Sequence, residues 1–233
     1  MENRIIEALA PFGPYSVFLY GSRGRGDHRE DSDYEVGVIF EDEKLVRRSL
    51  LHEKIRLDAV RIYPFKLSDV LAGEFNNPFV SQIFARELVE GAGKTIYGKQ
   101  VVEALKLPKI TTLDLMQCIR FEVGSAFTAL LAYRRGELKV SGREVGKSCF
   151  YGLLLYIILK QRKFVFSPEA AYEIGRGLEL EERYAKAIKN AHAVYMGSQE
   201  LRVDVAFENL AFLGFVEAEI LREFELRGIA ELV

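Results

Sequence analysis

Apolar positions in the first hundred residues fall into short runs separated by glycines and charges, a pattern typical of strands and short helices. A buried strand is expected after the Gly13-Pro14 break, and two further apolar runs follow it. Residues 87–97 suit an edge strand or a loop. The predicted strands are 15–20, 34–40 and 56–63, and the predicted helices are 2–10, 67–72 and 77–85.

The pattern changes after Pro108, where long segments of helical periodicity replace the strand signals. Glycines at 136, 142 and 197 are predicted to end helical segments, because glycine is favoured just past a helix C-terminus. The predicted helices of this part are 112–134, 144–161, 168–177, 181–196 and 200–226.

These two patterns predict an α+β fold with two domains. An N-terminal α/β domain is expected over residues 1–108, and an all-α helical bundle over residues 109–233. The 32 basic and 34 acidic residues nearly cancel, leaving a formal net charge of −2. Neither half has the basic excess of a general nucleic-acid binder, which weighs against DNA or RNA as the main partner.

Cysteine usage and hydropathy indicate a cytoplasmic protein without a membrane partner. Cys118 and Cys149 lie in apolar helical patterns, where buried, reduced thiols are expected. Two cysteines and three scattered histidines offer no zinc-binding spacing. The first residues lack the apolar core of a signal peptide, and the longest apolar run, 150–159, is too short to span a bilayer.

Candidate chemistry begins where the first predicted strand ends, at Gly21-Ser22. Glycine allows close backbone approach, and free amides together with the serine hydroxyl form an anion site. Arg23 and Arg25 add positive charge that suits a triphosphate. A lone Gly-Ser pair is usually only a turn, so this interpretation depends on the acidic residues that come after it in the chain.

Two carboxylates, Asp33 and Glu35, open the second predicted strand. Because side chains alternate along a strand, both are expected on one face, with Tyr34 and Val36 on the other. Like charges placed together need an offsetting cation, and oxygen ligands suit Mg²⁺. Asp58, in the third predicted strand, would add a carboxylate, and three carboxylates could hold two metal ions. An isolated Asp-x-Glu is more often a solvated strand edge; the ordered set favours a site.

The segment from Gly21-Ser22 to Asp33-x-Glu35, followed by Asp58, resembles the signature of the polymerase-beta-like nucleotidyltransferase superfamily. Within it, the chain is most similar to the kanamycin nucleotidyltransferase-like, two-domain enzymes. That subgroup also uses Asp-x-Glu where many relatives have Asp-x-Asp. The likeness extends to a helical C-terminal domain with a comparable layout of helices and glycines.

The resemblance implies a small mixed sheet with flanking helices, ATP or another nucleoside triphosphate as donor, and two Mg²⁺ ions. It implies Gly21 and Ser22 on the phosphates, and Asp33, Glu35 and Asp58 as metal ligands. It also implies an acceptor cleft between the domains, and a homodimer whose active site borrows from both subunits.

A general base would assist transfer to a hydroxyl. In the kanamycin-type enzymes this base is a Glu on the first long helix of the C-terminal domain. Here that helix offers Glu122 as its only mid-helix acid. The alternative is a solvated Glu122 paired with Arg120 or another cation. Asp58 is a second candidate for the base.

The predicted function is therefore Mg²⁺-dependent transfer of a nucleoside monophosphate to a hydroxyl of a small molecule, with an aminoglycoside as the first guess. One alternative is AMP transfer onto a protein by an antitoxin-type enzyme. The helical half lacks the Arg-x4–6-His spacing of the partner toxins, so a fused toxin–antitoxin is not expected. The other alternative is a degenerate nucleotide-binding protein, although every carboxylate position of the motif is filled.

Overall fold

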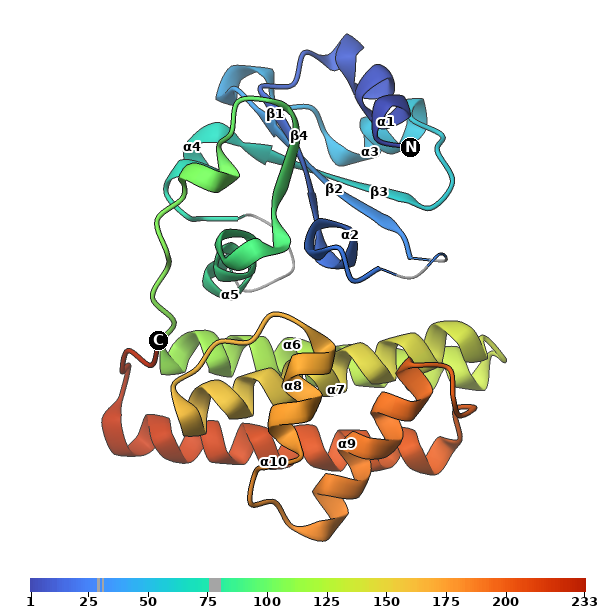
Figure 1. The fold of residues 1–233 in the computed structure, drawn as a ribbon, viewed down its shortest axis with the longest axis vertical. Coiled ribbons are helices and arrows are strands. Elements are labelled where there is room, and N and C mark those ends of the chain that lie inside the picture. Colours follow the sequence, from blue (N-terminus) through green and yellow to red (C-terminus); the bar gives the residue numbers. More distant parts are fainter. Residues whose placement is uncertain (29, 31, 76–80) are drawn as a thin grey trace. The chain divides into compact units, whose positions relative to one another are not determined.

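The chain forms two compact units, Met1–Pro108 and Lys109–Val233. The first holds a four-stranded mixed sheet with short helices, and the second is built from long helices (Figure 1), so the predicted α+β class is confirmed. The computed structural model of the protein describes residues 1–28, 30, 32–75 and 81–233.

The sheet of the first unit has the strand order β3-β2-β1-β4. Strand β1 is antiparallel to β2 and β4, whereas β2 and β3 are parallel. The elements run in this order: α1 Glu2–Leu9, η1 Ala10–Phe12, β1 Ser16–Tyr20, α2 Gly21–Arg25, β2 Tyr34–Phe40, η2 Asp42–Lys44, α3 Arg48–Lys54, β3 Val60–Lys66, α4 Leu67–Leu71, α5 Ser81–Glu87, the π-helical turn η3 Leu88–Ala92, β4 Lys94–Gly98 and η4 Val102–Ala104.

The first two predicted strands are confirmed, but the third begins later than predicted, at Val60. The delay has a local cause, because Asp58 and Ala59 form a turn in which Ala59 adopts a left-handed φ of 58°. Of the predicted helix 77–85, residues 77–80 lie outside the described part of the chain. The segment 87–97 contains η3 and most of β4.

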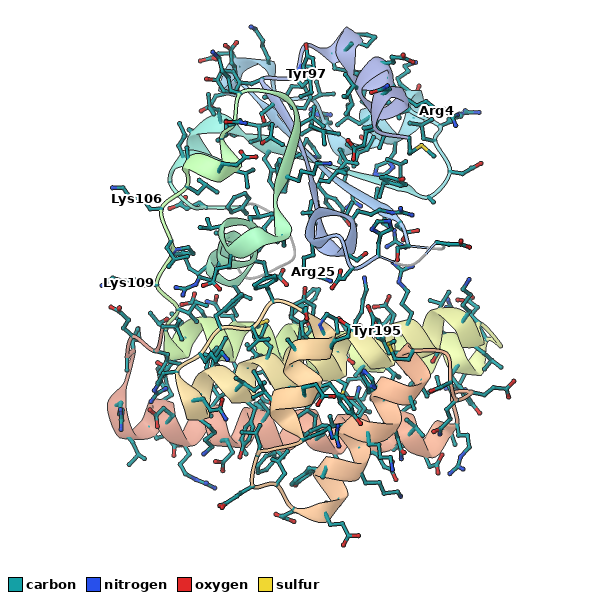
Figure 2. The ribbon with its side chains drawn as sticks, viewed as in Figure 1. Arg4, Arg25, Tyr97, Lys106, Lys109 and Tyr195 are labelled. Carbon is teal, nitrogen blue, oxygen red and sulfur yellow. The ribbon has the colours of Figure 1, made fainter. Side chains whose placement is uncertain are left out.

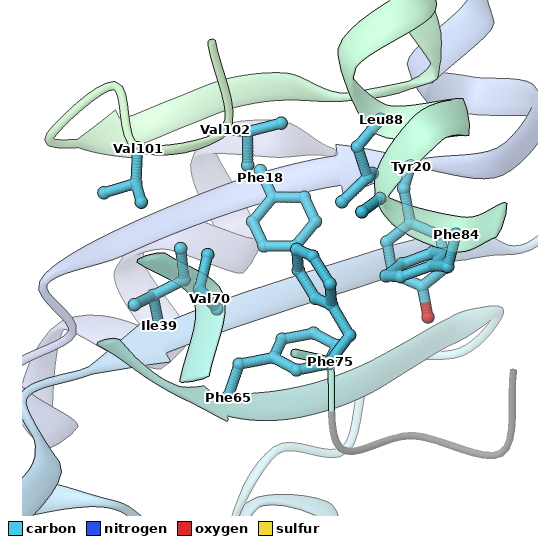
Figure 3. Packing of buried hydrophobic residues seen from close by; sticks show 11 residues of the cluster. Phe18, Tyr20, Ile39, Phe65, Val70, Phe75, Phe84, Leu88, Val101 and Val102 are labelled. Carbon is cyan, nitrogen blue, oxygen red and sulfur yellow. The ribbon is translucent and has the colours of Figure 1, made fainter. Parts of the chain in front are cut away.

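One face of the sheet, here called the aromatic face, is covered by packed rings (Figure 3). Phe65 and Phe75 lie with ring centroids 5.5 Å apart, and Phe75 and Phe84 with centroids 5.2 Å apart. Phe18 lies over Gly37, where an added Cβ would fall 2.0 Å from the ring. Glycine at 37 therefore lets the ring lie close to the sheet. The opposite face is mainly aliphatic and is covered by Ile5 and Leu9 of α1, by Leu51 of α3 and by Ile55, which follows α3.

The second unit packs its longest helices side by side. Gly136 and Gly197 follow helices with left-handed φ values of 79° and 72°, as predicted for stops. Gly142 does not stop a helix, because it lies inside α7, where an added Cβ would be 3.1 Å from Val194 of α9. This glycine thus permits close helix packing. The helices are α6 Thr112–Arg134, α7 Leu138–Gln161, α8 Pro168–Gly175, α9 Glu182–Tyr195 and α10 Val203–Arg227.

The start of α6 is held by a capping box and by the C-terminus. Thr111 accepts a hydrogen bond from the Asp114 amide, and the Asp114 carboxylate accepts one from the Thr111 amide. The Ile110 amide donates to the Val233 carbonyl at 2.9 Å, and the Leu232 amide donates to the Ile110 carbonyl at 2.8 Å. Both ends of the second unit therefore meet at the beginning of α6.

Helix α6 is, among the described residues, the one helix long and apolar enough by length and composition to cross a membrane. Its apolar window is 44% buried within the structure, and the helix packs against α7 and α10. A core helix of a soluble protein passes the same test, so this is weak support for a membrane span.

The two cysteines give a test of this packing. Both thiols are buried, as predicted, and burial raises the pKa of Cys149 to about 12. Since the thiolate is the reactive form, Cys149 should react with iodoacetamide at pH 8 far more slowly in the folded protein than in denaturant. Mass spectrometry of timed samples measures this difference. Equal rates in the two states would contradict the packing described.

Candidate active site

The Gly21-Ser22 pair lies at a sharp junction between β1 and the short helix α2. Gly21 has a φ of 64°, in the left-handed region that favours glycine, and Gly26 ends α2 with a φ of 86°. Gly24 lies against η3, since an added Cβ would fall 1.8 Å from the Ala92 carbonyl oxygen. Glycines therefore shape the turn and seat α2 on its neighbour.

Glu35 lies directly beside this turn. It is paired with Tyr20 in the β1–β2 register, one residue before the turn. A Cβ added to Gly21 would fall 2.0 Å from Glu35 Oε2, so the carboxylate occupies the space that any side chain at 21 would need. The Gly21-Ser22 turn and the Glu35 carboxylate thus lie next to each other.

Asp33 lies just before β2 and reaches the same side of the sheet as Glu35. Its Oδ2 is 2.9 Å from Nε of Arg61, the residue paired with Glu35 in the parallel β2–β3 register. Tyr34 and Val36 pack on the opposite, aliphatic face. The predicted alternation of the two acids is therefore confirmed.

Asp58 is not in the third strand, contrary to prediction. It is exposed in the turn that precedes β3, and Arg61 takes the position opposite Glu35. Within the described residues, no group of three or more His, Cys, Asp or Glu is arranged to hold a metal ion. Two neighbouring carboxylates still fit Mg²⁺, which completes its shell with waters and substrate phosphates.

The two arginines after Gly21-Ser22 contact the loop around them. Arg23 donates to the Ser32 carbonyl, at 3.0 Å from Nη2, and its guanidinium lies 4.1 Å from the centroid of the Tyr34 ring. Arg25, labelled in Figure 2, pairs with Asp27 at 3.0 Å. In this structure both arginines brace the loop between α2 and β2, so their predicted role toward a triphosphate stays a prediction.

Residues 3–90 match the family model described as a nucleotidyltransferase domain. The first unit contains a nucleotidyltransferase domain. The predicted resemblance and the predicted enzyme class, a nucleotidyltransferase, are thereby confirmed. The turn, Asp33, Glu35 and Arg61 all lie within the matched residues.

Among solved structures, the chain is similar to spectinomycin adenyltransferase AAD(9) from Enterococcus faecialis, whose crystal structure holds ATP and spectinomycin. The TM-score is 0.62 at 13% sequence identity, and the match covers 94% of this chain and 97% of the other. At this identity the likeness shows the fold, which therefore spans both units. No curated protein matches the sequence significantly.

The nucleotidyltransferase domain also buries the hydroxyl of Tyr20 beside Glu35. Tyr20 is 3% exposed, and its hydroxyl has no hydrogen-bond partner within the described residues. Burial raises the pKa of Tyr20 well above its usual value, and the Glu35 and Tyr63 side chains add to the rise. A row of Tyr20, Glu35 and Arg61 thus crosses three adjacent strands on the aromatic face.

Glu122 is buried on α6, at 4% exposure. This burial contradicts the solvated alternative, and Arg120 forms an ion pair with Glu217 at 3.4 Å; a pairing of Glu122 with another cation stays a prediction. Glu87, at the end of α5, is also buried, at 6% exposure. The sequence offered no motif for Glu87, and Arg61 was missed because its place opposite Glu35 depends on the parallel β2–β3 register.

Gly24 offers a test of how α2 is seated. Gly24→Ala should lower stability by about 1–3 kcal/mol, because its Cβ overlaps a backbone oxygen that cannot swing away. Gly124→Ala is the matched control: its Cβ meets nothing within 4 Å, and alanine favours the helix by about 0.5–1 kcal/mol. Urea unfolding followed by circular dichroism measures both variants. Equal stability changes would contradict the contact with Ala92.

Proposed function

We propose that the protein transfers a nucleoside monophosphate from a nucleoside triphosphate, with ATP as the first choice, to a hydroxyl of a small molecule in a Mg²⁺-dependent reaction. The observation that carries this proposal is the contact between the Gly21 turn and the Glu35 carboxylate, with Asp33 on the same side of the sheet. A phosphate-binding turn and two metal-binding acids are what such a transfer requires.

In the proposed reaction, the acceptor oxygen attacks the α-phosphorus, the new O–P bond forms, and the bond to the pyrophosphate oxygen breaks. The acceptor proton passes to a carboxylate base, and pyrophosphate leaves. Gly21 and Ser22 would hold the phosphates through their amides and the serine hydroxyl. Asp33 and Glu35 would hold Mg²⁺, which supplies charge neutralisation at the phosphates. A third ligand role for Asp58 stays a prediction.

The nature of the acceptor is supported by the structural neighbour. The AAD(9) crystal structure holds ATP and spectinomycin, and its fold matches this chain over almost the whole length. A cationic, polyhydroxylated antibiotic of the aminoglycoside type is therefore the first acceptor to test. Mg²⁺ dependence, a homodimer and a cytoplasmic location are further parts of this proposal.

The rival functions differ in where a labelled nucleotide ends. Incubation with α-³²P-labelled ATP, GTP, CTP or UTP and pooled aminoglycosides, metabolites or proteins separates them. Label on a small molecule supports the proposal, label on a protein supports the antitoxin-type alternative, and triphosphate binding without transfer supports a degenerate nucleotide-binding protein.

Asp33 is the sharpest test of the metal site. Asp33→Asn should lower transfer at least a hundredfold and weaken Mg²⁺–triphosphate binding, because it removes one of two charged ligands. Glu41→Gln, a half-exposed acid just past the other end of β2, is the matched control and should stay active. Isothermal titration and initial rates give both readouts. Normal turnover by Asp33→Asn would refute the proposed metal site.

The general base can be identified by comparing three isosteric variants. Glu122→Gln should lower kcat about 10²- to 10⁴-fold with donor binding retained, and should remove the acidic limb of the pH–rate profile. Asp58→Asn and Glu87→Gln report on the exposed candidate and the other buried acid. An unchanged rate in Glu122→Gln would pass the role to whichever of these two loses that limb.

A further inference from the structure

Arg61 lies on β3, the strand on which the sequence predicted a third carboxylate, Asp58. The parallel β2–β3 register places it opposite Glu35, and Glu35 in turn lies opposite Tyr20 of β1. The two acids of the proposed site thus face a cation on the neighbouring strand. This cation lies in the same row across the sheet as Glu35.

The contact between Arg61 and Asp33 is direct but open to water. Arg61 Nε lies 2.9 Å from Asp33 Oδ2, and the arginine side chain is 51% exposed while the Asp33 side chain is 15% exposed. The charge of Arg61 also acts on Tyr20, whose pKa it lowers against the stronger raising effects of burial and Glu35. Arg61 therefore serves as a counter-ion for Asp33.

The ion pair between Arg61 and Asp33 can readily be replaced by a bound cation. An ion pair with one half-exposed partner adds little stability, since water and salt compete with it. A divalent cation bound by both Asp33 and Glu35 would gain more from the same carboxylate. Arg61 would then lose its partner while remaining beside the place where donor phosphates arrive.

The other nearby arginines are held by different contacts. Arg23 donates to backbone carbonyls of the loop, and Arg25 pairs with Asp27. Arg48 lies with its guanidinium 3.9 Å from the centroid of the Tyr63 ring and donates to His52. Arg61, by contrast, forms its ion pair with a proposed metal ligand, Asp33. Its planar guanidinium is suited to bidentate phosphate binding.

We propose that Arg61 is an exchangeable counter-ion, which neutralises Asp33 in the ligand-free enzyme and turns to a phosphate oxygen of the donor when Asp33 binds Mg²⁺. This assignment rests on the proposed nucleotidyltransferase function. It gives the site a built-in cation in place of a third carboxylate. It also couples the two ligands, because Mg²⁺ binding at Asp33 releases Arg61 for a donor phosphate.

The test uses Arg61→Gln, which keeps a similar shape and removes the charge. Without nucleotide, the variant should bind Mn²⁺ about 2- to 5-fold more tightly than wild type, because residue 61 no longer competes for Asp33. Its affinity for a non-hydrolysable ATP analogue with Mg²⁺ should fall about 10- to 100-fold, because a charge-assisted phosphate contact is lost. Electron paramagnetic resonance counts free Mn²⁺, and isothermal titration measures the analogue.

Two further variants serve as controls for this interpretation. Arg56→Gln removes the same charge from the exposed segment before β3 and should change neither affinity. Arg61→Lys keeps the charge without the bidentate fork, so Mn²⁺ affinity should stay near that of wild type while analogue affinity falls partly. General damage to the fold would lower the affinities for Mn²⁺ and for the analogue together, whereas the proposed exchange raises the first and lowers the second.

The outcomes separate the two levels of the proposal. If wild type binds Mn²⁺ and the analogue but Arg61→Gln binds Mn²⁺ no more tightly, or binds the analogue equally well, the role of Arg61 is overturned and the transferase proposal stands. A wild-type protein that binds neither ligand overturns both. Opposite shifts in Arg61→Gln, absent in Arg56→Gln, support the exchange.

Discussion

The antiparallel pairing of β1 with β2 is the constraint on which the site depends. Its register sets Tyr20 against Glu35, so the turn that follows Tyr20 lies beside the carboxylate on the neighbouring strand. A slip of one residue would exchange the two faces of β2 and carry Glu35 onto the aliphatic face. Buried Val36 and Val38 on that face hold the register in place.

Packing on the aromatic face positions the polar groups that this register brings together in the row of Tyr20, Glu35 and Arg61. Phe18 fills the space over Gly37, and the Tyr20 ring lies 5.1 Å from that of Phe84, so the hydroxyl beside Glu35 is positioned by hydrophobic packing. Charge in the row is balanced locally by Arg61, because two acids on one strand end would otherwise repel each other. Hydrophobic packing therefore fixes the backbone, and Arg61 offsets the repulsion between the two acids in the absence of a ligand.

The sequence was sufficient for features set by local rules. Strand alternation correctly placed Asp33 and Glu35 on one face, and the Gly21-Ser22 turn needed only a strand followed by glycine. The third strand was misplaced because Arg-Leu-Asp-Ala alternates like a strand, while the left-handed Ala59 that breaks it is a non-glycine residue with no sequence signature. Gly142 was misinterpreted because its reason is packing against Val194, a contact that local sequence does not contain. Arg61 became visible only through the parallel register.

The meeting of both chain ends of the second unit has a consequence for its cohesion. The last residues form hydrogen bonds with Ile110, just before α6 begins. The C-terminal segment therefore holds the start of the helix that carries the buried Glu122. The N-terminal turn of this helix is thereby completed by residues more than a hundred positions away. An extension fused to Val233 would emerge beside the segment that joins the two units, and trimming the last residues would loosen α6 from its beginning.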